Sequence, residues 1–344
     1  MKGILNSELS EKLIKTFEAS SGLDCILIIN TESRDPNFTY FSGLKGPFEH
    51  DVLIIKKNTA VLLASSLEYE NALAQKKVRV VKRVKNSRFL EKNVKYKKVG
   101  LNASFLPMAL YSQIKKKYRP KKIVDVSGAL AEARLVKTSS ELKKIKKAVE
   151  ITKKAFREIP GFFKSGVSEK QLALIFDELL LKFGSEENAF KTIVAFGKNS
   201  ALPHHEPGES KLKKGDLILI DAGAKFKGYC SDLTRTFVFE ADYEKFKVLF
   251  DCVEEARSLI LNSLKPGVDF KKIKELFEYV LKKNGFNPIH AFGHSVGVEV
   301  HEPAVGKIKK GMVVAVEPGV YVEGFGGVRV EDDFLITEKS NVEL

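Results

Sequence analysis

The sequence predicts a two-domain protein, with an α/β domain at the N-terminus followed by an α+β domain. The first part of the chain alternates short apolar runs with helical segments, which is typical of strands that pack against helices. The second part holds two successive units, each with two predicted helices followed by a hairpin that carries two acidic residues. With 344 residues, the chain is long enough for two domains and a well-buried core.

Short apolar runs place the strands of the first domain. Residues 25–29, 52–55 and 60–64 are rich in isoleucine, leucine and valine, and they predict buried strands. Residues 99–101 and 123–126 are weaker candidates of the same kind. Because helical segments lie between these runs, we expect a single α/β domain in this part of the chain.

Two capping-box patterns mark the beginning of the second domain. Residues 138–141 and 168–171 each place a serine or threonine three positions before a glutamate or glutamine, a pattern that opens helices. The two helices are expected to end near Pro160 and Gly184. Two later helices are expected over residues 242–264 and 270–283.

Four acidic residues stand in or beside strand-like runs of the second domain. Asp221 and Asp232 lie eleven residues apart across a first hairpin. Glu317 and Glu331 lie fourteen residues apart across a second hairpin. An ionised carboxylate in apolar surroundings is costly unless it is paired or bound to a metal ion. Because turns can bring both members of a pair onto the same face, we expect the four carboxylates at one central site.

Five of the six histidines lie near these carboxylates in the sequence. His204 and His205 precede the aspartate pair, and His290, His294 and His301 fall between the two acidic pairs. Histidine supplies neutral ligands and proton transfer near pH 7. Four carboxylates and one imidazole form a donor set that could hold two divalent ions, which predicts a metal-dependent hydrolase.

The acidic pairs and one histidine resemble the metal site of the pita-bread metallopeptidases, a family that includes Xaa-Pro dipeptidase (prolidase), aminopeptidase P and methionine aminopeptidase. Five sequence blocks match in order between residues 130 and 335. Ser295 departs from the pattern, since many members have glycine there, but the ligands are intact. The matching set is Asp221, Asp232, His294, Glu317 and Glu331.

The resemblance extends to the first domain. Residues 35–44 look like the signature of the N-terminal domain of prolidase, aminopeptidase P and creatinase. Methionine aminopeptidases lack that domain and creatinase lacks the metal set, so the two resemblances together favour the proline-specific members. They imply a creatinase-like α/β domain over residues 1–127 and an α+β pita-bread catalytic domain with pseudo-twofold symmetry over residues 128–344. His204, after Pro203, resembles a Pro-His element of those members.

The resemblance implies a role for each ligand. Asp221 would bind one ion, and His294 and Glu317 would bind the other. Asp232 and Glu331 would bridge the two ions, since a carboxylate has two oxygens. Glu317 would also accept a proton from the water activated between the ions and later deliver one to the leaving nitrogen.

Further roles follow from the same resemblance. His204 or His301 would stabilise the oxyanion of the tetrahedral intermediate. Thr234 and Arg329 would orient the bridging carboxylates. The full set expected to bind substrate or to orient the ligands is His290, Arg329, Tyr321 and Thr234. The sequence suggests no role for His205.

The implied activity is metal-dependent hydrolysis of the Xaa-Pro peptide bond, with dipeptides as the expected substrates. Cleavage of longer Xaa-Pro peptides, as by aminopeptidase P, is the alternative. The expected cofactors are two Mn²⁺ or Co²⁺ ions per subunit, and Zn²⁺ or Fe²⁺ would also fit the donors. A non-catalytic pita-bread interaction protein is a remote alternative, because such relatives typically lose the ligands that this chain retains.

Composition limits the partners. The net charge of +14 raises the question of nucleic acid, but the densest basic stretch, residues 76–98, contains a valine-rich segment typical of a solvated edge strand. Nucleic-acid binding is therefore not expected. No apolar run approaches the roughly 18 residues of a membrane span, and charges near the N-terminus argue against a signal peptide. We expect a cytoplasmic protein, and a homodimer as in two-domain relatives.

Overall fold

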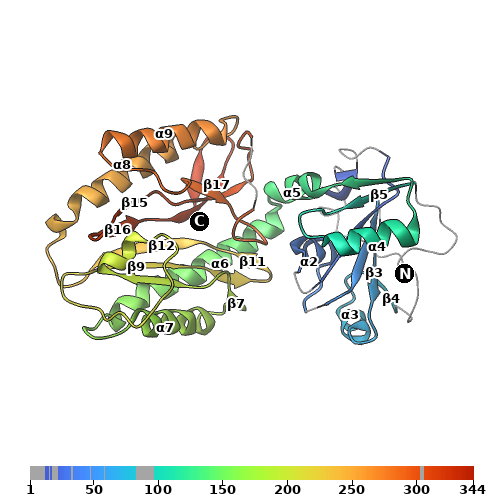
Figure 1. Ribbon diagram of the computed structural model, residues 1–344, viewed down its shortest axis with the longest axis horizontal. Coiled ribbons are helices and arrows are strands. Elements are labelled where there is room, and N and C mark those ends of the chain that lie inside the picture. Colours follow the sequence, from blue (N-terminus) through green and yellow to red (C-terminus); the bar gives the residue numbers. More distant parts are fainter. Residues whose placement is uncertain are drawn as a thin grey trace. The chain divides into compact units, whose positions relative to one another are not determined.

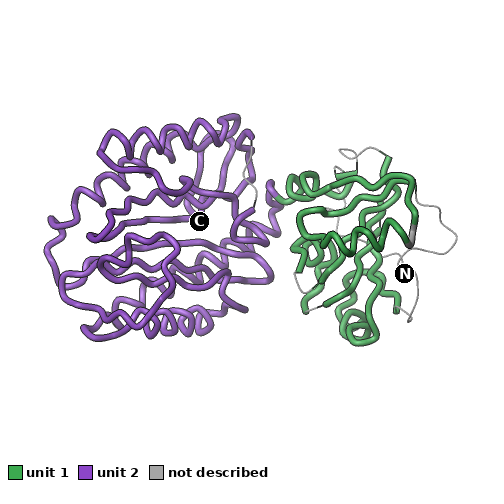
Figure 2. The backbone as a smooth tube through the Cα atoms, viewed as in Figure 1, with its two compact units in different colours: residues 1–134 green, residues 135–344 purple. Residues whose placement is uncertain are grey.

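The structure, a computed structural model, describes residues 12–14, 16–17, 22–31, 34–46, 48–57, 59–82, 97–302 and 306–344. The chain forms two compact units, Met1–Arg134 and Leu135–Leu344 (Figure 2). Helix α5 (Ser127–Leu135) lies at the junction. The domain boundary predicted from the sequence lies between residues 127 and 128, at the beginning of this helix. The position of that boundary stays a prediction.

Six of the described strands form one sheet in the first unit, in the order β4-β3-β2-β1-β5-β6. The pairs β1–β2 and β2–β3 are antiparallel, and β1–β5, β5–β6 and β3–β4 are parallel. The five strands predicted from apolar runs are confirmed. Their bounds are β1 (Cys25–Ile29), β2 (Val52–Lys56), β3 (Thr59–Ala64), β4 (Arg79–Lys82), β5 (Lys98–Leu101) and β6 (Lys122–Asp125).

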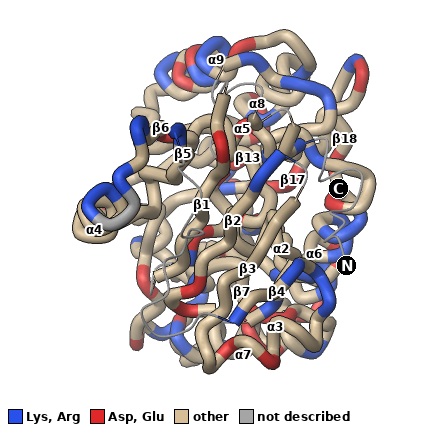
Figure 3. The backbone as a smooth tube through the Cα atoms, turned by 90° about the vertical axis from the view of Figure 1, so that its right-hand side faces the viewer, with Lys and Arg blue, Asp and Glu red and all other residues tan. Residues whose placement is uncertain are grey.

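Part of the basic stretch, strand β4, forms one edge of this sheet. Arg79 and Lys82 of β4 are exposed, as expected for a solvated edge. In Figure 3, Lys and Arg segments are drawn in blue beside the β4 label. Charged residues on an edge strand oppose pairing with another chain. Residues 83–96, the part of the basic stretch between β4 and Lys97, lie outside the described residues.

Helix α2 (Pro36–Ser42) accounts for the N-terminal signature in physical terms. Asp35 caps the helix, because its carboxylate accepts from the backbone N–H of Asn37 at 2.9 Å. Proline occupies the first helical position, and Gly43 ends the helix in the left-handed conformation with φ 67°. The described part of the unit also contains the helices α3 (Tyr69–Gln75) and α4 (Met108–Tyr118).

The second unit repeats one arrangement of two helices followed by three strands. The first copy is α6 (Ser139–Glu158), α7 (Glu169–Lys182), β8 (Ile193–Phe196), β9 (Leu217–Ala222) and β12 (Leu233–Val238). The second copy is α8 (Lys247–Ser263), α9 (Phe270–Lys283), β13 (Gly293–Ser295), β14 (Val313–Val316) and β17 (Asp332–Ile336). Helices α8 and α9 lie on one side of the strands and α7 lies on the other (Figure 1).

In both copies the middle strand pairs antiparallel with its two neighbours. Strand β9 lies between β8 and β12, and β14 lies between β13 and β17, which also pairs with β18 (Asn341–Glu343). Shorter elements complete the unit: η1 (Ile159–Phe162), β7 (Glu187–Asn188), η2 (Gly197–Ala201), β10 (Ala224–Phe226), β11 (Tyr229–Cys230), η3 (Tyr243–Lys245), β15 (Gly319–Val322) and β16 (Gly326–Arg329).

Both predicted capping boxes open helices. Thr138 and Glu141 cap α6 reciprocally, and Ser168 and Gln171 cap α7 in the same way. Helix α9 has the bounds expected from the sequence. The expected start of the preceding helix is wrong, because Asp242 caps a short 3₁₀ turn, η3, and α8 begins only after it.

Strand β14 is buried on both faces. Val313 and Ala315 pack in an apolar cluster with residues of α6 and α7, whereas Val314 and Val316 pack with residues of α8 and α9. Successive side chains of a strand point to opposite faces, so a strand between two clusters must be apolar along its length. Strand β9 is also buried throughout. A carboxylate in or after such a strand is therefore held in apolar surroundings.

Within the described residues, no helix combines the length and apolar character that a membrane span needs.

The close approach of β13 and β14 gives a test of this packing. A Cβ atom added at Gly293 would lie 2.0 Å from the carbonyl oxygen of Ala315, so Gly293→Ala must push the strands apart. We expect the free energy of unfolding to fall by about 1–3 kcal/mol, the usual cost of overpacking. Gly161→Ala is the control, because no neighbouring described group lies within 4 Å of its added Cβ. Urea unfolding of the metal-free protein measures both, and equal stabilities would contradict the packing.

Candidate metal centre

The predicted ligands come from the middle of the second unit, where its two halves meet. Asp221 lies in β9, and Asp232 immediately precedes β12. Glu317 follows β14, while Glu331 lies between β16 and β17 and forms a backbone bridge with Thr234 of β12. The bridge consists of two N–H···O bonds, of 3.3 and 3.1 Å, and it joins the two halves at the site itself.

Among the described residues, three overlapping groups of side chains could hold a metal ion. Within each group, one ligand atom per residue lies within 4.8 Å of the others. Asp232, His294 and Glu331 each belong to two groups, and of these three only Asp232 and Glu331 have the two carboxylate oxygens that a bridging ligand needs. Their bridging role stays a prediction. The groups are Asp221–Asp232–Glu331, His294–Glu317–Glu331 and Asp232–His294–His301.

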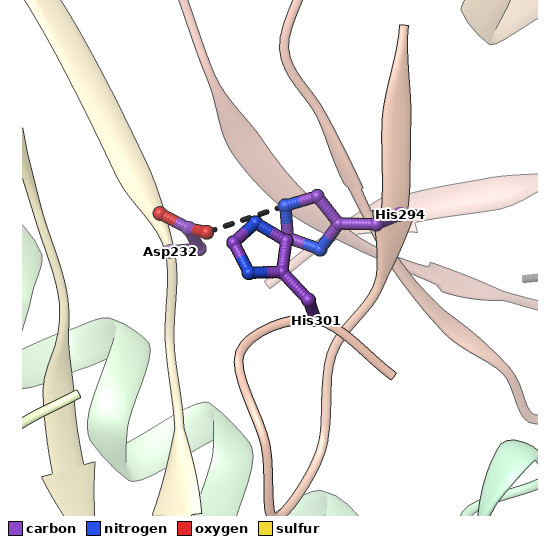
Figure 4. Close-up of side chains that lie close together, drawn as sticks. All are labelled: Asp232, His294 and His301. Atoms are coloured by element: carbon purple, nitrogen blue, oxygen red, sulfur yellow. Dashed lines mark ion pairs between the residues drawn. The ribbon is translucent and has the colours of Figure 1, made fainter. Parts of the chain in front are cut away.

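His301, which was predicted to stabilise the oxyanion and not to bind metal, lies directly beside the predicted ligands. Its ring centre is 4.2 Å from that of His294, and His294 Nε2 is 3.4 Å from Asp232 Oδ2. Figure 4 shows the three side chains converging, Asp232 from one half of the unit and both histidines from the other. The geometry therefore allows His301 either to contact an ion or to face a molecule bound beside it.

The carboxylates leave oxygen atoms unsatisfied at the centre of the cluster. Asp221 Oδ1, Asp232 Oδ1 and Glu331 Oε1 are buried without a hydrogen-bond partner among the described residues. Buried polar atoms are rarely left unpaired in proteins, because desolvation without compensation costs free energy. A bound cation would satisfy these oxygens, so the residues present fit a divalent metal centre.

Burial and mutual repulsion shape the charges of the site. Burial raises the pKa of Asp232 and Glu331 well above their ordinary values, and neighbouring carboxylates raise it further. Burial also raises the pKa of Glu317 to about 8, against the opposing charge of Arg329. Burial lowers the pKa of His294 to about 4, so its ring is neutral near pH 7 and keeps a lone pair for a metal.

Arg329 connects the ligands to the surrounding structure. Its Nη2 donates to Asp221 Oδ2 at 2.6 Å, and its Nε donates to Thr234 Oγ1 at 3.1 Å. Thr234 Oγ1 in turn donates to Glu331 Oε2 at 2.7 Å. Arg329 is only 3% exposed, so these bonds are shielded from water. The guanidinium thus holds one oxygen of Asp221 and, through Thr234, one of Glu331, and it leaves their unpartnered oxygens to face the centre.

Tyr321 and His290 extend this network. Arg329 Nη1 donates to the hydroxyl of Tyr321 at 2.6 Å. Burial lowers the pKa of His290 to about 4, so its ring is neutral near pH 7. His290 Nδ1 lies 2.6 Å from the carbonyl oxygen of Ala291, which can only accept, so Nδ1 carries the proton. Nε2 is then the acceptor for the Tyr321 hydroxyl at 2.9 Å.

His204 lies near the site on the chain that follows η2. Its own side chain is exposed. Burial lowers the pKa of His301; Asp221 opposes this effect and His204 adds to it, so both residues lie within electrostatic reach of the ring. His204 also contributes to the lowered pKa of His290. The two histidines predicted to act on the oxyanion therefore lie within electrostatic reach of each other.

Sequence reasoning missed an acidic pair beside the ligands. Asp332 is buried and accepts from Arg235 Nη2 at 2.5 Å and from Arg257 Nη2 at 3.0 Å. Asp333 is fully buried and accepts from the backbone N–H of Asp232 at 3.0 Å, and burial raises its pKa to about 8. The signal was the continuation of acidic residues after Glu331, which is unusual in a strand.

A buried ion pair supports the segment that carries His301. Lys137 Nζ lies 2.8 Å from Glu302 Oε2, and both side chains are 1% exposed. The other oxygen of Glu302 accepts from the backbone N–H of Val298 at 3.1 Å. The glutamate directly after His301 was the only sequence signal for this pair, and its lysine partner is distant in the chain.

The fold and the site together define a two-domain metallopeptidase. Residues 143–338 match the metallopeptidase family M24, and residues 10–136 match the creatinase/prolidase N-terminal domain. The chain therefore belongs to metallopeptidase family M24. A creatinase-like domain followed by a pita-bread domain was expected from the sequence, and that expectation is confirmed. Membership of this family implies dependence on divalent metal ions.

Named relatives and solved structures span nearly the whole chain. The chain is 34% identical to the Xaa-Pro dipeptidase of Pyrococcus horikoshii over 349 aligned residues. The alignment covers 99% of this chain and 97% of that protein. It is similar to the crystal structure of a prolidase from the same organism, with TM-score 0.89, 32% identity and coverage of 98% and 97%. It is also similar to an X-Pro aminopeptidase from Thermotoga maritima, with TM-score 0.85, 30% identity and coverage of 95% and 96%.

Loss of either carboxylate that is predicted to bridge two ions should remove bound metal. Asp232→Ala and Glu331→Ala each delete a donor that belongs to two of the three groups, so we expect the metal content to fall to one ion or none per chain. Asp251→Ala, on the exposed face of α8, is the control. Elemental analysis after dialysis against Mn²⁺ measures the content. Two retained ions in either bridging variant would contradict the assignment.

The Arg329 network should control how tightly metal binds. Arg329→Lys keeps the charge but loses the fork that contacts Asp221, Thr234 and Tyr321 together. Changes to groups that orient metal ligands typically cost 10–100-fold in affinity, and we expect an effect of about that size. Titration calorimetry with Mn²⁺ measures it. An unchanged dissociation constant would show that the carboxylates hold their orientation without this arginine.

Proposed function

We propose that this chain hydrolyses the Xaa-Pro peptide bond of dipeptides, using two divalent ions held by the predicted ligand set. The observation that carries this proposal is the cluster of buried, unpartnered carboxylate oxygens at the junction of the two halves. Support for the substrate class comes from the Xaa-Pro dipeptidase and prolidase to which the chain is similar over nearly its whole length.

The proposed division of labour follows the donors. Asp221 would hold one ion, His294 and Glu317 the other, and Asp232 and Glu331 would bridge them. Two divalent ions, when bound, supply positive charge and activate a water molecule. The ions we propose are Mn²⁺ or Co²⁺, while Zn²⁺ and Fe²⁺ also suit carboxylate and imidazole donors.

Glu317 is the carboxylate best suited to move a proton. Its side chain is 19% exposed, against 6% for Asp232, so substrate and water can reach it. We therefore assign to Glu317 the acceptance of a proton from the attacking water and its delivery to the leaving nitrogen.

Two imidazoles are assigned to the developing oxyanion. His204 and His301 are both exposed, and His204 lies within electrostatic reach of the His301 ring. A hydrogen bond from either ring would stabilise negative charge on the carbonyl oxygen of the scissile bond. Arg329 is assigned an orienting role and not a substrate-binding one, since it is buried and donates to Asp221, Thr234 and Tyr321.

Proline specificity has a simple physical basis. The nitrogen of an Xaa-Pro bond carries no N–H group, and the pyrrolidine ring has a fixed shape. A site formed around that ring can exclude ordinary peptides.

Cleavage of longer Xaa-Pro peptides is the second candidate, favoured by the similarity to the X-Pro aminopeptidase of Thermotoga maritima. We further propose a cytoplasmic homodimer that does not bind nucleic acid.

Substrate length separates the two candidates. A dipeptidase must recognise the proline carboxylate, which needs a cationic or multiply donating partner in a partly buried pocket. We expect Xaa-Pro dipeptides to be cleaved, and amidation of the proline carboxylate or addition of a third residue to lower kcat/KM at least about tenfold. The measurement is initial rates on matched dipeptides, amides and tripeptides with Mn²⁺ or Co²⁺ supplied.

The same panel contains its own controls. Peptides that begin with methionine and lack proline should not be cleaved. Equal or faster cleavage of Xaa-Pro-Xaa tripeptides would favour the aminopeptidase. Failure on every Xaa-Pro substrate, with both ions bound, would overturn the proposed proline specificity.

A further inference from the structure

The segment of residues 197–208, here called the His204 loop, is fixed on its inner side by strand β16. Ser200 Oγ accepts from the backbone N–H of Gly327 at 2.8 Å and donates to the carbonyl oxygen of Gly197 at 2.6 Å. A Cβ atom at Gly327 would lie 2.3 Å from the carbonyl oxygen of Ser200, so glycine is needed for this close approach. One side of the loop therefore rests directly on the strand that ends in Arg329.

A single buried carboxylate holds the outer side of the His204 loop. Glu169 is fully buried, and each of its oxygens has two donors. Oε1 accepts from the backbone N–H of Phe196 at 2.9 Å and from Asn199 Nδ2 at 2.8 Å. Oε2 accepts from the backbone N–H of Gly208 at 3.1 Å and lies 2.8 Å from His205 Nε2. The four partners span the loop from the residue before it to its last residue.

Helix capping does not account for this carboxylate. Glu169 is the first residue of α7, but Ser168 and Gln171 already cap that helix reciprocally. The side chain of Glu169 bonds to the loop and not to the free N–H groups of its own helix. A fully buried carboxylate is costly to desolvate, and the four donors compensate that cost only while the loop keeps this conformation.

The two residues beside His204 are both fixed. The carbonyl oxygen of Pro203 lies 3.4 Å from Arg329 Nη1, on the metal-centre side. The backbone N–H of His205 donates to the carbonyl oxygen of Leu202 at 3.1 Å, and its ring lies against Glu169 on the other side. Because an ionised carboxylate can only accept, His205 Nε2 carries the proton in this contact. His204 is therefore held between an anchor to Arg329 and an anchor to Glu169.

We propose that Glu169, through His205, is a positioning residue that holds His204 at the metal centre. The inference rests on the proposed function, in which His204 acts on the oxyanion of the substrate. It assigns His205 the work of a link between the buried carboxylate and the active loop, a role that the sequence did not suggest. Catalytic groups need to be held within about 0.5 Å of the productive geometry, which a freely moving loop cannot provide.

A double-mutant cycle tests the connection to His204. Glu169→Gln keeps the size of the side chain but replaces one carboxylate oxygen with an NH₂ group. That group would face two N–H donors and could accept from neither. We expect kcat on an Xaa-Pro dipeptide to fall about 10–100-fold, as for other small displacements of catalytic groups, with both ions retained. In the His204→Ala background, the same substitution should have little further effect on kcat, because the group that it positions is absent. Full additivity of the two losses would overturn the proposal.

Variants of His205 test the link itself. His205→Gln can still donate an N–H group to Glu169, whereas His205→Phe fills similar space without a donor. We expect His205→Gln to retain most of the wild-type kcat and His205→Phe to match Glu169→Gln. Equal activity of the two His205 variants would overturn the link. Glu150→Gln, an exposed carboxylate on α6 that pairs with Lys147 and Lys154, is the matched control and should behave as wild type.

Hydrogen exchange separates this proposal from the proposed activity. In the metal-loaded protein, Glu169→Gln should speed amide exchange in peptides that cover residues 196–208 and leave those of α8 and α9 unchanged. Unchanged exchange in the His204 loop would overturn the positioning role even if the enzyme cleaves Xaa-Pro dipeptides. If Glu169→Gln speeds exchange in the His204 loop but the wild-type enzyme cleaves no Xaa-Pro dipeptide, the positioning role stands and the proposed function is wrong.

Discussion

Burial of like charges at the junction of two half-domains is the constraint on which the second unit depends. Two strands that are apolar on both faces carry Asp221 and Glu317 into the core, and the bridge between Thr234 and Glu331 joins the halves there. Carboxylates in such surroundings repel one another and lack water. Their unpartnered oxygens keep this arrangement costly, and cations bound there would offset the cost, which would couple folding to metal binding.

The structure limits this cost with a small set of buried donors. Arg329 and Thr234 satisfy one oxygen each of Asp221 and Glu331, which fixes where their other oxygens point. Around this centre, buried charges hold the segments that carry the histidines: Glu169 binds the loop with His204, and the Lys137–Glu302 pair supports the segment with His301. Removing one partner from such a pair costs more than the pair itself contributes, because a buried charge is left alone.

The duplicated architecture explains why the site lies where it does. Each half contributes a middle strand between two neighbours. Asp221 is the penultimate residue of β9, and Glu317 directly follows β14. A pair of helices covers each half and supplies one apolar cluster. Neither half holds a complete donor set: the aspartates come from the first, and His294 and the two glutamates come from the second. The chemistry therefore requires both halves to be folded and joined.

Sequence alone predicted the main elements and a set of five ligands, since both leave local patterns in the chain. Apolar runs predicted the strands, capping boxes predicted α6 and α7, and carboxylates next to apolar strands indicated a metal site whose five donors the structure brings together. Only tertiary structure decided the rest. The start of α8 depended on a 3₁₀ turn, and the partners of Arg329, Glu169 and Lys137 are distant in the chain. Contacts between distant residues leave no periodicity or spacing in the sequence, so the groups that orient the site became visible only after folding.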